Sequence, residues 1–215
     1  MNRAIVLAGP SAVGKTTVVK HILDTTDDFY FLRSATTREK RGDAFDNEYI
    51  YLSVDEFKER IERGEMLEYT EHSGNFYGTP ISEIQKAFSE NKIPLLILDM
   101  NGIESLKSVK RDFETVGVYV YDKLSVLKDR LYERELSAGE GEKGRARYEK
   151  RCAQNIADYQ SLPGRSSLFD IIVRNKLVEY TAELILGYFR ENKVMSRAEV
   201  QVICKSLADS ANSAN

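Results

Sequence analysis

The feature that most constrains this chain is a phosphate-binding loop signature near its start. The apolar run Ile5-Val6-Leu7 breaks into Gly9-x-x-x-x-Gly14-Lys15-Thr16 and continues as a helical pattern. This is the strand, loop and helix order of a P-loop, in which backbone N–H groups cradle phosphates, the lysine reaches the β- and γ-phosphates, and the Ser or Thr hydroxyl binds Mg²⁺. A glycine-rich turn that binds nothing is the weaker alternative. The predicted nucleotide-binding loop residues are Gly9, Pro10, Ser11, Ala12, Val13, Gly14, Lys15, Thr16 and Thr17.

Composition favours an enzyme of the cell interior over a nucleic-acid or membrane protein. The chain has 215 residues, 42% of them hydrophobic, and a net charge of −3, so it lacks the basic field that favours nucleic-acid binding. No apolar run approaches the length of a membrane span, and Met1 leads directly into the first predicted strand, which leaves no room for a signal peptide. We therefore expect a cytoplasmic protein with no nucleic-acid or membrane partner, in which Cys152 and Cys204 are reduced thiols.

Predicted strands and helices alternate along the chain. This alternation predicts an α/β fold, a P-loop core with a parallel sheet covered on both faces. Residues 1–33 and 80–190 form this core in the prediction, and 34–79 form a small mixed β subdomain inserted into it. Within 34–79, Ser53 begins a capping box, and Thr79 is predicted to cap a helix that starts at Pro80.

The end of the chain carries a further helix signal. A capping box at Ser196 precedes a periodic apolar pattern, which predicts an extra amphipathic helix within 191–215, followed by a frayed tail. This helix packs either on the core or on a second subunit, so the sequence allows a monomer or a homodimer.

A carboxylate ends the next apolar strand, at Asp99. In P-loop proteins such a strand lies beside the first one, and its terminal Asp can position Mg²⁺ directly or through water. Because buried strands often end in Asp, the residue also has a purely structural interpretation. With the P-loop intact, we favour Thr16 and Asp99 as metal ligands.

Two arginine-bearing segments follow. Arg130 and Arg134 lie one turn apart on a predicted helix, and Arg145, Arg147 and Arg151 lie on a second one after the glycine-rich segment 136–144. Phosphoryl transfer spreads negative charge over several oxygens, so two such helices joined by a mobile loop are suited to a closing lid at about residues 130–151. A solvated helical hairpin with surface ion pairs explains the same pattern equally well.

Taken together, several ordered motifs resemble the guanylate kinase family over residues 3 to 190. They are the P-loop, Ser34-Ala35-Thr36-Thr37-Arg38 with Arg41, Glu68-Tyr69, the turn from Gly74 to Pro80, Asp99-Met100-Asn101-Gly102, and Phe169 to Asn175. The resemblance implies a P-loop core, a nucleoside-monophosphate-binding subdomain and a lid. It also implies transfer of the γ-phosphoryl group of ATP to GMP or dGMP with Mg²⁺, within purine nucleotide metabolism.

The resemblance assigns roles to matching residues. Arg38, Arg41 and Tyr49 correspond to groups that hold the acceptor's phosphate, and two guanidinium groups with a phenol suit a dianion. Glu68 corresponds to the carboxylate that accepts hydrogen bonds from N1–H and N2–H₂ of guanine, a pair that adenine does not offer. The remaining carried-over positions are Ser34, Tyr77 and Thr79 for the acceptor, Lys15, Arg38, Arg130, Arg134 and Arg151 for catalysis, and Asn175 for the adenine of ATP.

The chain departs from the family pattern at one position that bears on specificity. Where the family has an acidic residue two positions before Asp99, this chain has Ile97, which predicts a weaker preference for guanine. Two alternatives therefore stay open: a P-loop phosphotransferase with another nucleoside monophosphate or small phosphorylated acceptor, and a catalytically silent binding module. The intact P-loop, Asp99 and the lid arginines argue against the silent module.

Overall fold

A computed structural model of the chain describes residues 2–40, 49–72, 74–109, 112–136 and 141–213. The elements follow one another as β1 (Asn2–Ala8), α1 (Lys15–Thr25), β2 (Phe29–Phe31), β3 (Ser34–Thr36), β4 (Tyr49–Tyr51), α2 (Val54–Glu62), β5 (Met66–His72), β6 (Asn75–Pro80), α3 (Ile81–Ser89), β7 (Ile93–Ile97), α4 (Met100–Ser108), β8 (Phe113–Tyr121), α5 (Leu124–Leu136), α6 (Gly141–Arg165), a short 3₁₀ helix (Ser166–Leu168), β9 (Ile171–Arg174), α7 (Val178–Arg190) and α8 (Arg197–Asn212).

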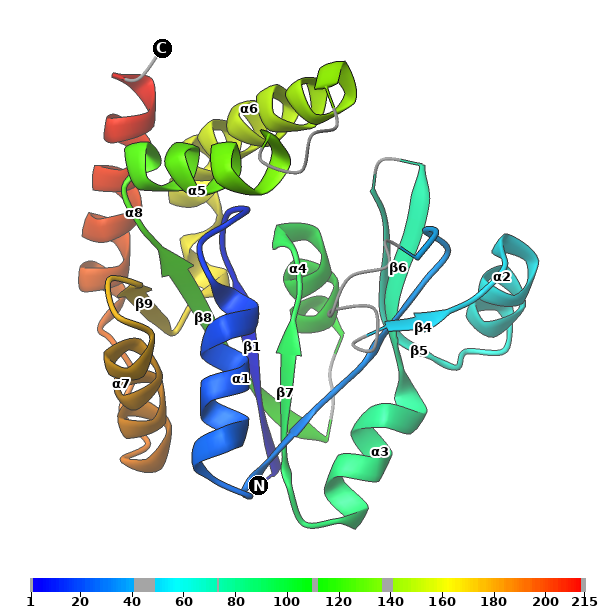
Figure 1. Ribbon diagram of the computed structural model, residues 1–215. Coiled ribbons are helices and arrows are strands. Elements are labelled where there is room, and N and C mark those ends of the chain that lie inside the picture. Colours follow the sequence, from blue (N-terminus) through cyan, green and yellow to red (C-terminus); the bar gives the residue numbers. More distant parts are fainter. Residues whose placement is uncertain (1, 41–48, 73, 110–111, 137–140, 214–215) are drawn as a thin grey trace. The chain divides into compact units, whose positions relative to one another are not determined.

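Five strands form the main sheet, in the order β2-β7-β1-β8-β9 (Figure 1). β2 pairs with β7 and β8 pairs with β9 in parallel. The strand interiors are continuously apolar and buried, from Ala4 to Ala8 in β1 and from Val118 to Val120 in β8. Such runs are typical of parallel strands that are covered on both faces. The predicted α/β fold class is confirmed.

Contacts divide the chain into two compact units, Met1–Val6 with Leu23–Thr115, and Leu7–Ile22 with Val116–Asn215. The first unit contains a four-stranded sheet in the order β4-β3-β6-β5. β3 runs parallel to β4 and antiparallel to β6, and β6 runs antiparallel to β5, so this sheet is mixed, as predicted. The boundaries and roles predicted for the inserted subdomain stay predictions.

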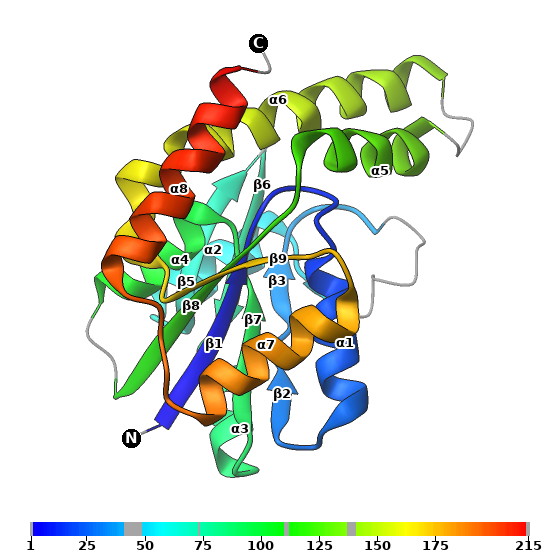
Figure 2. The same ribbon diagram turned by 90° about the vertical axis from the view of Figure 1, so that its left-hand side faces the viewer.

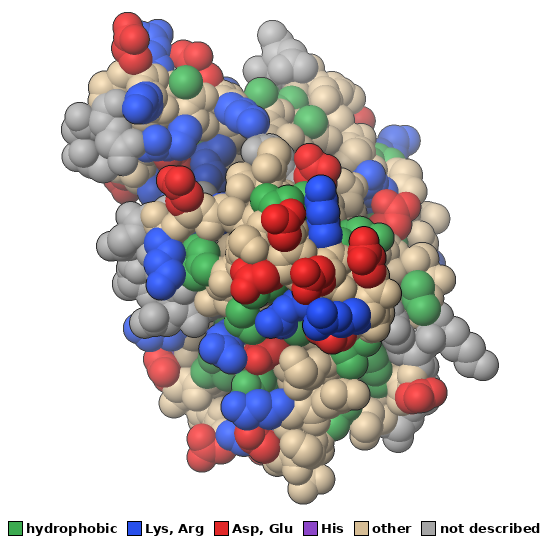
Figure 3. Space-filling view, turned by 90° about the vertical axis from the view of Figure 1, so that its right-hand side faces the viewer, with side chains coloured by type: hydrophobic (Ala, Val, Ile, Leu, Met, Phe, Trp, Pro, Cys, Tyr) green, Lys and Arg blue, Asp and Glu red, His purple; other side chains and the backbone are tan. Residues whose placement is uncertain are grey.

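One face of the four-stranded sheet is apolar and packs against α2. Ala35, Phe57 and Met66 form the buried centre of this cluster, and Phe76 stacks on Phe57 with ring centroids 5.4 Å apart. The outer face of α2 is exposed, and acidic and basic side chains are interspersed over it (Figure 3). That surface therefore offers no patch of a single charge.

In the second unit, three helices pack side by side. α5 packs against α6, and α8 packs along α6 (Figure 2). Val200, Cys204 and Ala211 of α8 are fully buried, and Gln160 of α6 donates a hydrogen bond to Asn212. The extra helix at the end of the chain thus packs on α6 of its own chain, which the sequence left open.

The helix ends test the local predictions. Capping boxes at Ser53 and Ser196 are both present, with the Ser hydroxyl and the Glu three residues later exchanging hydrogen bonds with the backbone. The predicted cap at Thr79 is wrong: α3 begins at Ile81 after Pro80, and the Thr79 hydroxyl donates to the Glu68 carboxylate instead. The predicted loop 136–144 is also too long, because α6 already begins at Gly141.

Both cysteines are free, and burial raises the pKa of the Cys204 thiol to about 11. Among the described residues, no helix is both long and apolar enough to cross a membrane.

Candidate functional site

The P-loop joins β1 to α1 and takes a conformation that its glycines permit. Gly9 has a φ of 152°, and a Cβ there would overlap the carbonyl oxygen of Val120. Gly14 has a φ of 94°, and a Cβ would lie 2.6 Å from the amide nitrogen of Asn175. Ala12, by contrast, is held at a φ of 64°, which costs a non-glycine residue about 1–3 kcal/mol. The loop is therefore a backbone cradle that is partly strained.

Lys15 lies at the mouth of this cradle. Its Nζ donates to the carbonyl oxygens of Gly9 at 2.7 Å and of Pro10 at 3.0 Å. Lys15 and Thr16 form the first turn of α1. The N–H groups of a first helical turn lack partners within the helix, and together with the helix dipole they favour a bound anion.

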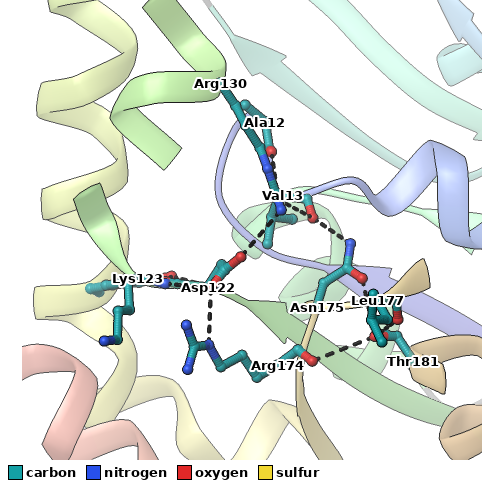
Figure 4. Close-up of polar contacts among 10 residues, drawn as sticks. Ala12, Val13, Asp122, Lys123, Arg130, Arg174, Asn175, Leu177 and Thr181 are labelled. Carbon is teal, nitrogen blue, oxygen red and sulfur yellow. Dashed lines mark hydrogen bonds and ion pairs between the residues drawn. The ribbon is translucent and has the colours of Figure 1, made fainter. Parts of the chain in front are cut away.

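Two buried asparagines support the loop from below. The side chain of Asn155 accepts from Ser11 N at 2.7 Å and donates to Ser11 O at 3.1 Å. The Asn175 amide nitrogen donates to Val13 O at 2.7 Å, and its oxygen accepts from the Thr181 hydroxyl at 3.0 Å (Figure 4). The structure thus places Asn175 beneath the loop, and its predicted contact with adenine stays a prediction.

Three of the five predicted lid arginines gather on one carboxylate, whereas Arg130 pairs with Asp122 and Arg145 with Glu149. Glu135 accepts from Nε of Arg134 at 3.0 Å and of Arg147 at 2.9 Å, and Arg151 lies 3.2 Å away. Burial works to raise the pKa of Glu135, but these three guanidinium groups outweigh it and lower that pKa. Arg151 also donates to the Ser11 hydroxyl at 3.3 Å, so the cluster reaches the P-loop. This arrangement is a joined network rather than a set of isolated surface pairs.

Five of the seven predicted acceptor residues share one face of the four-stranded sheet. Ser34 is opposite Tyr49, Thr36 is opposite Tyr77, and Glu68 is opposite Thr79. Directly opposed residues point to the same face, as do residues two apart on one strand. The register therefore brings together the face formed by Ser34, Tyr49, Glu68, Tyr77 and Thr79, opposite to the apolar face that packs on α2.

Glu68 is the buried charge-bearing group of this face. It is 3% exposed, and its Oε1 accepts from the Thr79 hydroxyl at 2.8 Å. A Cβ on Gly102 of α4 would sit 3.2 Å from Oε2 of Glu68, a tight contact, so a larger residue there would press on this carboxylate. Burial raises the pKa of Glu68, the hydrogen bonds from Thr79 oppose it, and the nearby Asp99 adds to it, so that the resulting pKa is about 7. A carboxylate held like this is a candidate binding group.

This raised pKa predicts how stability changes with pH. Because the folded protein binds the Glu68 proton more tightly than the unfolded chain, whose ordinary pKa is 4.5, stability falls as pH rises from about 4.5 to about 7. Glu68→Gln removes this dependence. Its unfolding free energy relative to wild type should rise by about 2–3 kcal/mol between pH 5 and pH 8. Urea unfolding at both pH values measures it. Glu71→Gln, an exposed carboxylate on the same strand, is the control and should leave the wild-type pH slope unchanged.

Arg38 lies against the same sheet. Its guanidinium carbon is 4.8 Å from the ring centre of Tyr49 and 5.6 Å from that of Tyr51. The structure thus brings together Arg38 and Tyr49, two of the groups predicted to hold a phosphate. The third, Arg41, lies outside the described residues.

The predicted metal ligands have different surroundings. Asp99 is exposed, and its Oδ1 accepts from Gly102 N at 2.7 Å, so it caps α4. Its second carboxylate oxygen has no role in that cap and suits a metal-bound water, and the Thr16 hydroxyl is the usual P-loop ligand. Within the described ranges, no three His, Cys, Asp or Glu side chains form a group that could hold a metal ion by themselves.

Sequence reasoning missed three residues that organise these groups: Asp122, Glu135 and Asn155. All are buried and polar. Glu135 lies directly after Arg134 in a charged helix, where a carboxylate is unremarkable, and Asn155 is one polar residue among many in α6. The order of strand and carboxylate at Asp122 repeats that at Asp99, and this is the one signal that could have found it.

A family model and curated relatives of known sequence indicate the same family. The sequence model described as Guanylate kinase matches residues 1–191. The chain is 32% identical over 189 residues to a guanylate kinase of Prochlorococcus marinus subsp. pastoris, covering 86% of this chain and 96% of that protein. It is 32% identical over 202 residues to one of Lactococcus lactis subsp. lactis, covering 90% and 92%.

A solved structure supports the fold. A guanylate kinase from Anaplasma phagocytophilum matches with a TM-score of 0.61 and 22% identity, over 91% of this chain and 88% of that one. The matched family region ends at residue 191, before α8 begins at Arg197.

Proposed function

Since the chain belongs to the guanylate kinase family, we propose that it transfers the γ-phosphoryl group of ATP to GMP or dGMP, giving ADP and GDP or dGDP. The observation that carries the acceptor assignment is the shared polar face of the four-stranded sheet, where buried Glu68 is hydrogen-bonded to Thr79. A site with such a buried acceptor discriminates strongly against substrates that cannot donate to it.

The residues that would bind ATP belong to the second unit. The P-loop amides hold the β- and γ-phosphates, and Lys15 turns its amino group from the loop carbonyls to them. Arg130, Arg134 and Arg151 neutralise the charge that develops on the transferred group. Catalysis here consists of positioning and charge stabilisation, so no general base is assigned, and His21 has no role in it.

The residues that would bind GMP belong to the first unit. Arg38 and Tyr49, with Arg41, hold the phosphate of GMP, and guanidinium groups suit this dianion because they donate in parallel pairs. Glu68 in its charged form accepts from N1–H and N2–H₂ of guanine. Ser34 and Thr79 offer hydroxyls to O6 or N7, and Tyr77 lies on the same face.

Mg²⁺ fits this chemistry, with Thr16 and Asp99 as its protein ligands. When bound, the ion would neutralise charge on the β- and γ-phosphates. Neither residue is part of a group of side chains that could hold the ion alone among the described residues, so its affinity should depend on ATP.

We also propose the location, the metabolic role and the oligomeric state of the enzyme. A net charge of −3 and small nucleotide substrates fit a cytoplasmic enzyme of purine nucleotide metabolism that works without nucleic acid or membrane, as a monomer or a homodimer.

An acceptor panel tests the function. Coupled release of ADP from MgATP is measured with GMP, dGMP, AMP, CMP and UMP. We expect GMP and dGMP to be the best acceptors, with a smaller margin over AMP than an enzyme with a second carboxylate in place of Ile97 would give, because Ile97 of β7 cannot accept a hydrogen bond from the base. A pyrimidine or AMP as the best acceptor would contradict the proposal.

A further inference from the structure

One buried carboxylate beside the P-loop is shared by two arginines. Asp122, directly after β8, is 2% exposed. Its Oδ2 lies 3.3 Å from Nη2 of Arg130, and its Oδ1 accepts from Nε of Arg174 at 2.9 Å (Figure 4). Arg130 comes from α5 and Arg174 ends β9, so the carboxylate joins two elements.

Asp122 is itself a fixed anchor. The Tyr159 hydroxyl, which is fully buried, accepts from Asp122 N at 3.2 Å and donates to Asp122 O at 2.5 Å. The backbone N–H of Lys123 donates to Oδ1 at 2.8 Å. With its backbone and one carboxylate oxygen held in this way, Asp122 determines where its arginine partners lie.

The two arginines are held unequally. Arg174 donates to Asp122 at 2.9 Å, an ordinary hydrogen-bond length, whereas the nearest nitrogen of Arg130 lies 3.3 Å from Asp122. Nη1 of Arg130 also lies 3.5 Å from Ala12 O and 3.4 Å from Val13 O, beyond the usual range for N–H···O bonds. The side chain of Arg130 is also the more exposed, at 36% against 27% for Arg174. Arg130 is therefore the partner that can change its contacts, and it already lies over two P-loop carbonyls.

Charge balance explains why a second arginine is present. A buried carboxylate that loses its counter-charge is strongly destabilising. If Arg130 moves from Asp122 to the phosphates of ATP, Arg174 still pairs with Asp122. Without Arg174, Arg130 would be the one guanidinium partner that the described residues give Asp122, and its transfer would leave that carboxylate unpaired.

We propose that Asp122 and Arg174 are positioning residues for phosphoryl transfer: Asp122 keeps Arg130 beside the P-loop, and Arg174 allows Arg130 to exchange Asp122 for the phosphates. The inference rests on the proposed function, because it concerns how Arg130 reaches the transferred group. Neither Asp122 nor Arg174 is required to touch the nucleotide.

A double-mutant cycle tests it. Arg174→Met should lower kcat for GMP about tenfold with little change in KM, because Arg130 stays bound to Asp122 in the transition state. Adding Asp122→Asn should restore part of that loss, because the neutral amide no longer retains Arg130 by charge but still accepts a hydrogen bond that keeps it beside the P-loop. In an Arg130→Met background, Arg174→Met should change kcat by no more than about twofold, since the two act through one group. Arg63→Met, which breaks an exposed pair with Glu59, is the control and should match wild type.

The outcomes separate the two proposals. Thermal unfolding of every variant identifies losses that come from misfolding. Two results would overturn the positioning role while leaving an active guanylate kinase. One is that Arg174→Met lowers kcat equally with and without Arg130. The other is that the Arg174→Met, Asp122→Asn double variant has a kcat no higher than that of Arg174→Met. A wild type that transfers nothing to GMP would overturn the proposed function, and this inference with it.

Discussion

Lys15→Ala is expected to reduce kcat with MgATP and GMP to less than about a tenth of the wild-type value. The amino group of Lys15 is held at the mouth of the P-loop by the carbonyls of Gly9 and Pro10, within reach of bound phosphates. Alanine removes this charge while retaining the backbone amides. Positive charge beside the transferred phosphoryl group is needed most in the transition state, so turnover suffers more than binding.

Steady-state kinetics with a circular-dichroism check of folding measures this effect. Lys20→Ala is the matched control: it removes an exposed lysine from the same helix, and it should retain wild-type kcat. A folded Lys15→Ala protein that keeps more than about a tenth of wild-type kcat would refute the P-loop as the phosphate site.

Local patterns in the sequence predicted local structure well. The Gly9 to Thr16 signature predicted the strand, loop and helix, and the structure places positive φ angles at Gly9, Ala12 and Gly14. The capping boxes at Ser53 and Ser196 were equally readable, because each depends only on residues three positions apart. Alternating strands and helices predicted the parallel sheet, and the ordered motifs predicted the family.

Contacts between distant residues could not be predicted in this way. Glu135 of α5 meets Arg147 and Arg151 of α6, and Asp122 pairs with Arg174 across 52 residues, only because the fold brings their elements together. Thr79 illustrates the same limit. Its position before Pro80 is typical of a helix cap, but strand pairing places it opposite Glu68, and the buried carboxylate takes its hydroxyl.

The surface against which α8 packs is the third feature that the sequence could not predict. An amphipathic pattern shows that a helix has one buried face, but not which surface covers it. The buried face of α8 packs on α6, the helix that also carries Arg147 and Arg151. The chain thereby supports the arginine-bearing helix with a segment that lies beyond the matched family region.

Glu68→Gln is the second substitution with a large expected effect. It keeps the size of the side chain but replaces one acceptor oxygen by an NH₂ group facing the N–H donors of guanine. Each mismatched, buried polar group costs about 1–3 kcal/mol, so kcat/KM for GMP should fall by about ten- to a hundredfold. AMP offers no such pair of donors, and its kcat/KM should change little.

The central claim is that this kinase recognises its acceptor through Glu68, and the most direct measurement is the ratio of kcat/KM for GMP to that for AMP in wild type and in Glu68→Gln. Glu71→Gln serves as the exposed carboxylate control on the same strand. The account predicts a ratio well above one in wild type and in the control, and a ratio at least about tenfold smaller in Glu68→Gln. An unchanged ratio in Glu68→Gln, or a wild type without preference for GMP, would contradict it.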